Sequence, residues 1–195
     1  MTEGNLEELR KFVCPEIVFG VGARMQAGLY ARNLGGRAVL VVSDPGVVDT
    51  GWTDQVAASI REAGLEAEIY EAVTPNPKDY EVMVGAEAYL KRGCNIIVAV
   101  GGGSPMDLAK GIGIVATNRG DIREFEGADL IRSPSPPLVF VPTTAGTSSD
   151  VSQFTIITHS EDKYKMAIVS RAIVPDVALV DPEVTTSMPP DLTAH

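Results

Sequence analysis

The sequence predicts an α/β fold, a Rossmann-like doubly wound parallel sheet with a β-hairpin appended. Short apolar runs recur along the chain, and at least three of them lack alternation, as expected of strands covered on both faces. Helical patterns separate the runs, and strand–helix alternation repeated three times is typical of βαβ units. Two later apolar stretches flank a polar turn. The four recurring runs lie at 38–42, 67–70, 96–100 and 138–141.

The predicted helices place apolar residues three or four positions apart, as one buried helical face requires. Glycine follows each of the first three, where it can end a helix in the left-handed conformation. The fourth follows a run of three glycines. In chain order the helical patterns cover about 23–34, 56–63, 80–90 and 108–115, and the glycines that end the first three are Gly35, Gly64 and Gly93.

The last third of the sequence differs from this pattern. Apolar stretches at 151–158 and 164–170 flank the polar residues 159–163, which predicts the hairpin, and 176–180 predicts one more strand. Residues 189–191 read Pro-Pro-Asp, a helix-start signal that is followed by only four residues. A helix without a body can neither nucleate nor bury a face. We therefore expect residues 1–195 to be one domain of a parent protein that continues past His195.

Composition excludes several classes of protein. The 195 residues are 45% hydrophobic and carry a net charge of −10, so we expect an ordered domain and no nucleic-acid partner. Cys14 and Cys94 have no CxxC partner, which favours a reduced, cytoplasmic protein. The polar N-terminal segment 1–12 is not a signal peptide, and no apolar run is long enough to cross a membrane.

The segment "VAVGGGSPMDLAKG" has the features of an anion site. Gly101, Gly102 and Gly103 lack a Cβ, so their backbone N–H groups can approach a ligand closely. Ser104 is expected to cap the following helix, with Asp107 three residues on as in a capping box. The helix N-terminus then presents N–H groups and a positive dipole end to a phosphate. The alternative is a tight, well-capped turn. The pattern is neither G-x-G-x-x-G nor a Walker loop.

Polar residues follow the other predicted strands. Asp44 ends the first strand, where it can accept from a ribose hydroxyl or start an Asp-Pro-Gly turn. Asn76 stands between two prolines, either displayed toward a ligand or in a plain loop. The hydroxyl-rich segment 141–152 begins at the end of the fourth strand. Because carboxyl ends of parallel strands share one edge of the sheet, these segments are expected to line a single ligand site.

Residues for catalysis are harder to find. Lys165 is the one cation in an apolar strand pattern, and it either contacts a phosphate or ribose or faces outward. His159 lies in the polar hairpin turn, where we expect it to be solvated. No His, Cys or carboxylate pair has metal-ligand spacing, and no Ser/His/Asp set is evident. We assign neither a catalytic nor a metal-binding residue.

Several ordered motifs together resemble the iron-containing (group III) alcohol dehydrogenases. They are "TPNP", "VGGGSPMDLAKGI", "FVPTTAGTSSDVS", "KMAIVS" and "PDVALVDPEVTTSMPPDLTA", and the resemblance begins at "FGVGA". It implies an N-terminal NAD(P)-binding α/β domain, a helical domain holding Fe²⁺ or another divalent metal, and hydride transfer between nicotinamide and an alcohol or aldehyde. The alternatives are an alcohol-dehydrogenase-like regulatory sensor on the same fold and a related polyol dehydrogenase.

The resemblance also assigns residues to the dinucleotide. Gly102, Gly103 and Ser104, in the loop that begins at Gly101, would hold the pyrophosphate, and Asp107 would face the nicotinamide-side ribose. Asp44 and Asn76 would lie along the adenosine half. An aspartate at position 44 would favour NAD over NADP, because a 2′-phosphate would meet a like charge. The remaining residues carried over are Thr143 and Thr144 at the adenine, with Ser149, Val151, Lys165 and Leu179 completing the cleft.

Two departures from the family pattern affect what this chain is expected to do. Ser148, Ser149 and Asp150 stand where the family usually has glycine, serine and glutamate. The metal-binding aspartate and histidines of the family follow "LTA", in a segment this chain lacks. We expect the chain to bind NAD weakly without turning over alcohols, to expose apolar surface near the hairpin and the last strand, and to form a homo-oligomer.

Overall fold

Six parallel strands form the central sheet of the protein, in the order β1-β9-β6-β4-β2-β3. The computed structural model describes residues 13–190. The N-terminal segment 1–12 and Asp191, the last residue of the Pro-Pro-Asp signal, lie outside the described residues. The strands are β1 (Glu16–Phe19), β2 (Ala38–Ser43), β3 (Glu66–Tyr70), β4 (Ile96–Gly101), β6 (Leu138–Pro142) and β9 (Val177–Val180).

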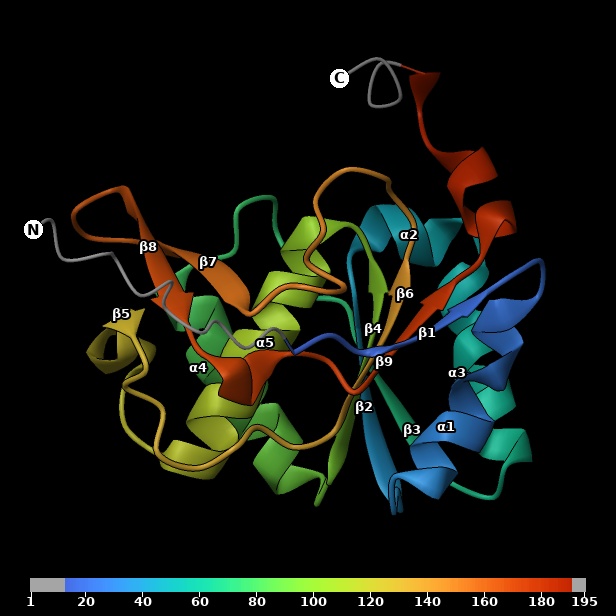
Figure 1. Ribbon diagram of the computed structural model, residues 1–195, viewed down its shortest axis with the longest axis horizontal. Helices are drawn as coiled ribbons and strands as arrows, with labels where there is room; N and C mark the ends of the chain where they lie inside the picture. The colour runs from blue at the N-terminus through green and yellow to red at the C-terminus, as the bar shows by residue number, and fades with distance from the viewer. Residues whose placement is uncertain (1–12, 191–195) are drawn as a thin grey trace, which may run out of the picture.

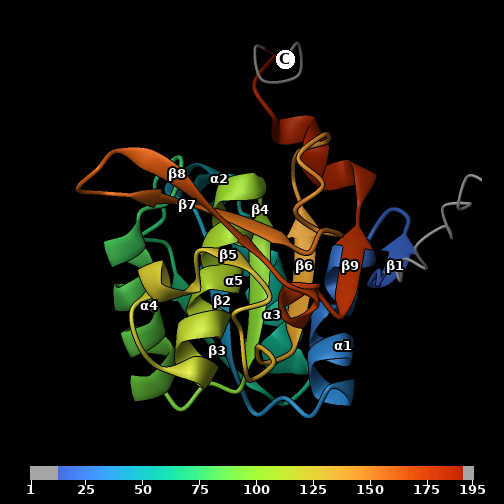
Figure 2. The same ribbon diagram turned by 60° about the vertical axis from the view of Figure 1, so that its left-hand side comes forward.

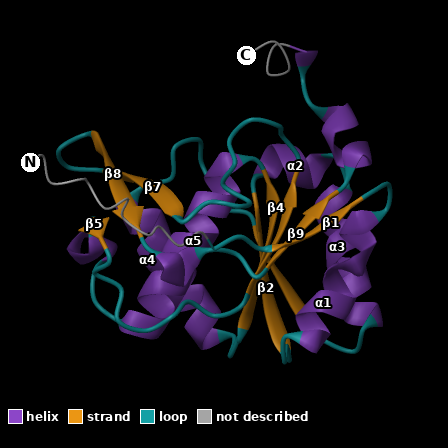
Figure 3. Cartoon of the chain, in the orientation of Figure 1, coloured by secondary structure: helices purple, strands orange, loops and turns teal. Residues whose placement is uncertain are grey.

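Helices cover both faces of this sheet, which is seen nearly edge-on in Figure 1 and coloured by secondary structure in Figure 3. α1 and α3 cover one face, and α4 and α5 cover the other. The doubly wound parallel sheet predicted from the apolar runs is therefore confirmed. The helices are α1 (Ala27–Asn33), α2 (Pro45–Asp49), α3 (Trp52–Glu62), α4 (Asp79–Lys91) and α5 (Gly103–Asn118).

The core explains why the predicted strands lack alternation. Val39 and Val41 of β2 pack in the cluster under α1 and α3, whereas Leu40 and Val42 pack in the cluster under α4 and α5. All six residues of β2 are buried, and so are all six of β4. Both faces of these strands are thus covered, as parallel sheets with βαβ crossovers require.

The predicted hairpin is present. It consists of β7 (Phe154–His159) and β8 (Tyr164–Val169), which pair antiparallel, with the short β5 (Gly127–Ala128) added alongside β8. Ile157 and Met166 on its inner face pack in the same cluster as residues of α5. Figure 2 shows the hairpin lying across the end of α4 and α5. Short 3-10 turns occupy Ala23–Gln26, Ile122–Phe125, Arg171–Ile173 and Pro182–Ser187.

The strand β1 has no counterpart among the predicted elements. It is only four residues long and lies at the edge of the sheet, paired with β9, so that Ile17 and Phe19 are exposed. Val177 and Leu179 of β9 are buried, but the neighbouring β1 exposes Ile17 and Phe19, so exposed apolar surface does lie near the last strand. Exposed apolar side chains do occur on the hairpin, at Phe154 and Tyr164.

A buried arginine joins the first 3-10 turn to the residues after β9. Arg24 Nη1 lies 2.6 Å from Asp181 Oδ2 and 2.7 Å from Glu183 Oε2, and its Nε donates to Gln55 Oε1 at 3.0 Å. The guanidinium also lies over the ring of Trp52, 4.7 Å from its centroid. One side chain thus fixes the carboxyl end of β9 against the N-terminal turn and α3.

Candidate cofactor site

The residues singled out in the sequence meet where the order of the sheet reverses. From β2 the chain runs outward to β3 and then crosses to β4 on the other side of β2, so the topological switch point lies between β2 and β4. Asp44 follows β2, Gly102 follows β4 and Thr143 follows β6, all at the carboxyl edge. The Thr143 N–H donates to the Gly101 carbonyl at 2.9 Å. Open α/β sheets bind ligands at such a switch point.

The N-terminus of α5 is not capped by a side chain. Its N-cap is Gly102, in an extended conformation, and the helix begins at Gly103. The prediction that Ser104 caps this helix in a capping box with Asp107 is therefore wrong, since Ser104 is already the second helical residue. Within the described residues no hydrogen bond is made by the backbone N–H of Gly103 or Ser104. An uncapped helix N-terminus with free N–H groups is suited to an anion.

Neighbouring side chains lie close to two of the three glycines. Gly101 has φ +152°, and a Cβ there would lie 2.6 Å from Pro105 Cγ, so a side chain would be excluded. A Cβ at Gly102 would lie 3.0 Å from Thr144 Oγ1. That hydroxyl oxygen is buried and has no hydrogen-bond partner in the part of the chain that the structure describes. A buried polar atom without a partner beside free N–H groups fits a ligand that supplies the missing hydrogen bonds.

Asp44 caps a short helix and also lies close to the glycine loop. Its Oδ1 accepts from the Val47 N–H at 3.1 Å and so caps the short helix α2, as the turn reading predicts. Its Oδ2 points toward the glycine loop, because a Cβ at Gly101 would lie 3.4 Å from it. The carboxylate therefore stands at the switch point beside the anion site.

Asn76 belongs to a loop that is tied down on both sides. Its N–H donates to the hydroxyl oxygen of Ser104 at 3.2 Å, and its carbonyl accepts from Thr158 Oγ1 at 3.2 Å. The Thr158 N–H donates to the Pro77 carbonyl at 2.7 Å. Asn76 itself is exposed, with φ +55°. The loop after β3 is thereby fixed between the glycine loop and the hairpin, with the Asn76 side chain displayed.

Asp107 lies on the first turns of α5 and faces the hydroxyl-rich segment. Its Oδ1 accepts from Ser149 Oγ at 3.2 Å, and its carbonyl accepts from Thr155 Oγ1 at 2.8 Å. Burial raises the pKa of Asp107 to about 6, although the charge of Lys110, the Ile156 N–H and the Ser149 hydroxyl all oppose this rise. A carboxylate with a pKa near neutrality is typical of functional sites.

The other predicted residues lie around this group to different extents. Val151 is half-buried, and Lys165 is exposed on β8, where its charge acts on Asp107. Leu179 is fully buried with Val177 and Val141 in the cluster under α1 and α3. The role given to Leu179 stays a prediction.

Sequence reasoning missed one residue of this region. Lys110 is fully buried, and its Nζ donates to the carbonyls of Ser152 and Phe154, both at 2.8 Å, and to Ser152 Oγ at 3.2 Å. The signal was present in the sequence, because a lysine three positions after Asp107 interrupts the otherwise apolar pattern of α5.

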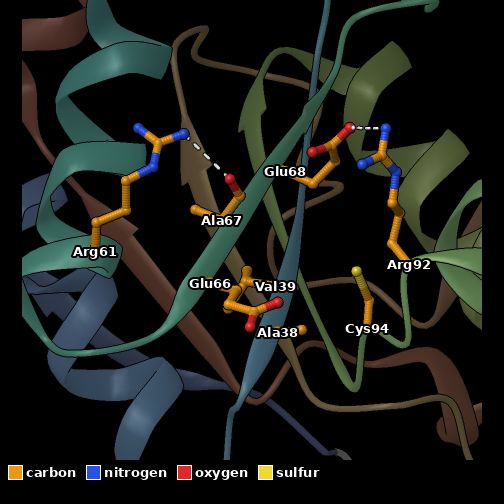
Figure 4. A pocket seen from close by; sticks show the side chains of 8 residues that line it. All are labelled: Ala38, Val39, Arg61, Glu66, Ala67, Glu68, Arg92 and Cys94. Carbon is orange, nitrogen blue, oxygen red and sulfur yellow. Dashed lines mark hydrogen bonds and ion pairs between the residues drawn. The ribbon is translucent and has the colours of Figure 1, made fainter.

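A shallow pocket of about 340 Å³ lies at the opposite, amino-terminal edge of β2 and β3 (Figure 4). Three of its charged side chains already have partners, since Arg92 pairs with Glu68 at 2.8 Å and Arg61 donates to the Ala67 carbonyl at 3.1 Å. Burial raises the pKa of the Cys94 thiol there to about 11, which leaves it protonated and unreactive. This pocket is separate from the candidate site.

Two further findings concern the described residues, 13–190, as a whole. No group of three or more His, Cys, Asp or Glu side chains among them is arranged to hold a metal ion. None of the helices in that range has the length and apolar character needed to cross a membrane.

The fold is a doubly wound α/β domain, with the uncapped N-terminus of α5 at its switch point. The family described as "Iron-containing alcohol dehydrogenase" matches residues 14–182. This chain belongs to the iron-containing alcohol dehydrogenase family, as its motifs suggested.

Characterised relatives extend this assignment. The chain is 42% identical over 178 residues to 1,3-propanediol dehydrogenase of Citrobacter freundii, covering 90% of this chain and 46% of that protein. It is 38% identical over 182 residues to NAD-dependent methanol dehydrogenase of Bacillus methanolicus, with coverage of 93% and 48%. The chain thus spans about half the length of these relatives.

Solved structures of related proteins have the same fold as this chain. The crystal structure of 1,3-propanediol oxidoreductase superposes with a TM-score of 0.93 at 40% identity, covering 96% of this chain and 49% of that one. NADH-dependent butanol dehydrogenase A from Thermotoga maritima gives a TM-score of 0.89 at 32% identity, with coverage of 95% and 47%.

Proposed function

We propose that this chain binds NAD at the carboxyl edge of the sheet, as the nucleotide-binding part of a metal-dependent alcohol dehydrogenase. The observation that carries the proposal is the uncapped N-terminus of α5 at the switch point, where Gly102 replaces a capping side chain. The names of two relatives, NAD-dependent methanol dehydrogenase and NADH-dependent butanol dehydrogenase A, support the choice of cofactor. When bound, NAD supplies the nicotinamide that accepts or donates hydride.

The pyrophosphate would lie against the glycine loop. The N–H groups of Gly103 and Ser104 donate to it, and the positive end of the α5 dipole favours its charge. Gly101 allows the loop its left-handed conformation, and Gly102 allows the backbone to approach the phosphates. Thr144 Oγ1, buried beside Gly102 without a partner in the described chain, gains one from the ligand.

The adenosine half would lie toward β2 and β3. Asp44 Oδ2 accepts from a ribose hydroxyl while Oδ1 continues to cap α2. Asn76 is displayed from its fixed loop, and Thr143 and Thr144 flank the adenine. Because a 2′-phosphate would lie against the Asp44 carboxylate, NAD is preferred to NADP.

The nicotinamide half would lie between α5 and the hairpin. Asp107 accepts from the ribose on this side, oriented by the hydroxyl of Ser149. Lys165 lies near enough to act on the charge of Asp107 and donates to the same ribose or a phosphate. Val151 and the backbone of Leu179 complete the cleft.

The substrate would be a small alcohol or aldehyde. Relatives named methanol, choline and 1,3-propanediol dehydrogenase support this class, and the last of these favours a diol as a second candidate. Fe²⁺ or another divalent metal is proposed for the whole protein, with ligands outside this chain. Residues 13–190 offer no ligand set for a metal. A regulatory sensor on the same fold would bind NAD through the same residues.

A cytoplasmic homo-oligomer is the proposed physiological state. The edge strand β1 supports self-association, since Ile17, Phe19 and nearby Val21 are 55%, 75% and 78% exposed. Exposed apolar side chains along a sheet edge are a common site of association.

Isothermal titration calorimetry of the 195-residue chain with NADH tests the proposal. We expect saturable binding that Gly102→Ala weakens by at least about tenfold, because the added Cβ would lie 3.0 Å from Thr144 Oγ1 and crowd the proposed phosphate position. Gly85→Ala is the matched control, since its Cβ would lie 2.4 Å from Ile112 Cδ1, in the core under α4, and should lower stability without changing NADH affinity. Absence of binding by the folded wild-type chain would contradict the proposal.

A further inference from the structure

Lys110 is a buried cation without an ion-pair partner within the described residues. Its side chain is fully buried, and no carboxylate there lies within 4.0 Å of its Nζ. An ammonium group has three N–H donors, and all three are used, on the carbonyls of Ser152 and Phe154 and on Ser152 Oγ. Taking a charge out of water is costly even when it is fully hydrogen-bonded, so an apolar residue of similar size would suit this core position at least as well for packing alone.

The acceptors of Lys110 lie next to the proposed cofactor residues. Ser152 follows Val151 directly and is three residues from Ser149. Phe154 begins β7, and the next two residues contact Asp107, because Thr155 Oγ1 donates to its carbonyl and the Ile156 N–H donates to its carboxylate. Asp107 and Lys110, one turn apart on α5, together hold segment 149–156 against the helix.

We propose that Lys110 is a positioning residue of the cofactor site, whose ammonium fixes segment 152–154 and thereby keeps Ser149 on Asp107. The inference rests on the proposed NAD site. Lys110 itself does not contact the cofactor, since its three donors are occupied by the protein.

Charged groups around Lys110 make its role dependent on pH. Asp107 on the same helix and Asp150 on the loop before β7 act on its charge. Lys165 of β8 acts on Asp107 in turn. From β6, the Phe140 ring lies 5.9 Å from Nζ. Burial lowers the pKa of Lys110 to about 8, against the opposing charges of Asp107 and Asp150. A neutral amine has two N–H donors and a lone pair, so one of its three acceptors loses its donor.

Fold stability and cofactor binding should therefore respond to pH in opposite directions. Between pH 8 and 10.5, the unfolded chain binds more protons at Lys110 than the folded chain, so this residue makes stability rise with pH. Over the same interval the loss of the ammonium releases segment 152–154, and affinity for NADH falls. A residue that served only the fold would not produce these opposite trends.

The test combines two measurements on the 195-residue chain. Hydrogen–deuterium exchange without cofactor compares the wild type with Lys110→Met and with Lys91→Met, an exposed lysine of α4 as matched control. We expect faster exchange of segment 149–156 in Lys110→Met alone. Calorimetric titration with NADH should show a Kd about tenfold higher in the same variant. Unchanged exchange in a folded Lys110→Met chain would overturn the positioning role.

The two proposals fail in distinguishable ways. Faster exchange in Lys110→Met, together with no NADH binding by the wild type, would refute the NAD site while upholding the attachment of segment 149–156. If Lys110→Met does not fold, the pH dependence of the wild type decides whether Lys110 has the positioning role. The positioning role is supported if the Kd of the wild type for NADH rises between pH 7 and 9.5 while the free energy of unfolding, measured with urea over the same range, does not fall. A Kd that stays constant over this range overturns the role.

Discussion

The backbone N–H of Asn76 donates to the hydroxyl oxygen of Ser104 at 3.2 Å, which joins the loop after β3 to the first turn of α5. The two residues are 28 positions apart and come from different βαβ units. Their contact places the proposed adenosine and pyrophosphate regions side by side. Ser104, as the second residue of α5, does not cap the helix, and its hydroxyl oxygen serves the neighbouring loop instead.

Replacing Ser104 by alanine should weaken NADH binding more than it weakens the fold. The bond is at an exposed position, so we expect a loss of at most about 1 kcal/mol in the free energy of unfolding. NADH affinity should fall several-fold, as the Asn76 loop is no longer fixed. Urea denaturation and calorimetry measure the two effects, and Ser104→Thr, which keeps the hydroxyl, is the control. Equal affinity in Ser104→Ala and wild type would contradict this role.

Replacing Asp44 by serine should shift cofactor preference toward NADP. Serine is also a favoured N-cap, so α2 should keep its cap while the negative charge is removed. We expect the ratio of the Kd for NADPH to that for NADH to fall by about tenfold, because like-charge repulsion with the 2′-phosphate is lost. Asp44→Asn should behave similarly. A ratio unchanged in both variants would exclude Asp44 from the ribose site.

Asp107 should make both the free energy of unfolding and the affinity for NAD⁺ depend on pH. Its pKa is raised from 3.8 to about 6 by burial, so the stability associated with its neutral form is complete below pH 3.8 and is lost as the pH rises through about 6. Asp107→Asn should therefore be more stable than the wild type at pH 7.5, with a smaller difference at pH 5. Urea denaturation at the two pH values measures this. A stability difference that does not change with pH would contradict the raised pKa.

The same carboxylate should control binding in acid. Protonation of Asp107 removes a charged acceptor for the ribose hydroxyl, so the Kd of the wild type for NAD⁺ should rise as the pH falls from 7.5 to 5. Asp107→Asn should bind more weakly at pH 7.5 and show little pH dependence. Calorimetry with NAD⁺ gives both profiles, and a flat wild-type profile would remove Asp107 from the site.

Among the charged side chains, Arg24 should be one of the largest contributors to the free energy of unfolding. Arg24→Met leaves Asp181 buried without its partner, which typically costs about 3–5 kcal/mol. Burial alone would raise the pKa of Asp181, but hydrogen bonds from Arg24 and the Glu183 N–H hold it below its usual value. The stability it contributes is thus present at neutral pH and lost in acid.

An exposed ion pair provides the control for Arg24. Arg92→Met removes a pair with Glu68 in which both side chains are largely exposed, and it should cost less than about 1 kcal/mol. Urea denaturation at pH 7.5 compares the two variants. Similar losses would show that the Arg24 contacts do not act as a buried pair.

Local sequence patterns predicted the parts of the fold that depend on local chemistry. The fully apolar β2 and β4 indicated a sheet covered on both faces, and the glycines after β4 indicated an anion site at a helix N-terminus. The family motifs then predicted that distant residues meet at one site, and the structure places Asp44, Asn76 and Thr144 around the glycine loop.

Features set by tertiary contacts could not be predicted in this way. β1 is a short edge strand whose exposed Ile17 and Phe19 give no buried-strand pattern. Ser104 has the residue type of an N-cap, but its hydroxyl is engaged by a loop 28 residues away. Lys110 finds its acceptors 42 and 44 residues further along the chain, beyond any periodicity.

The central claim is that the N-terminus of α5 holds the dinucleotide pyrophosphate. The most direct measurement is a ¹H–¹⁵N NMR titration of the 195-residue chain with NADH. The account predicts that the backbone amides of Gly102, Gly103 and Ser104 show the largest shifts, with smaller ones at Asn76 and Ser149. Shifts confined to residues of the opposite edge, such as Arg61 and Arg92, or no shifts in the glycine loop at saturating NADH, would contradict it.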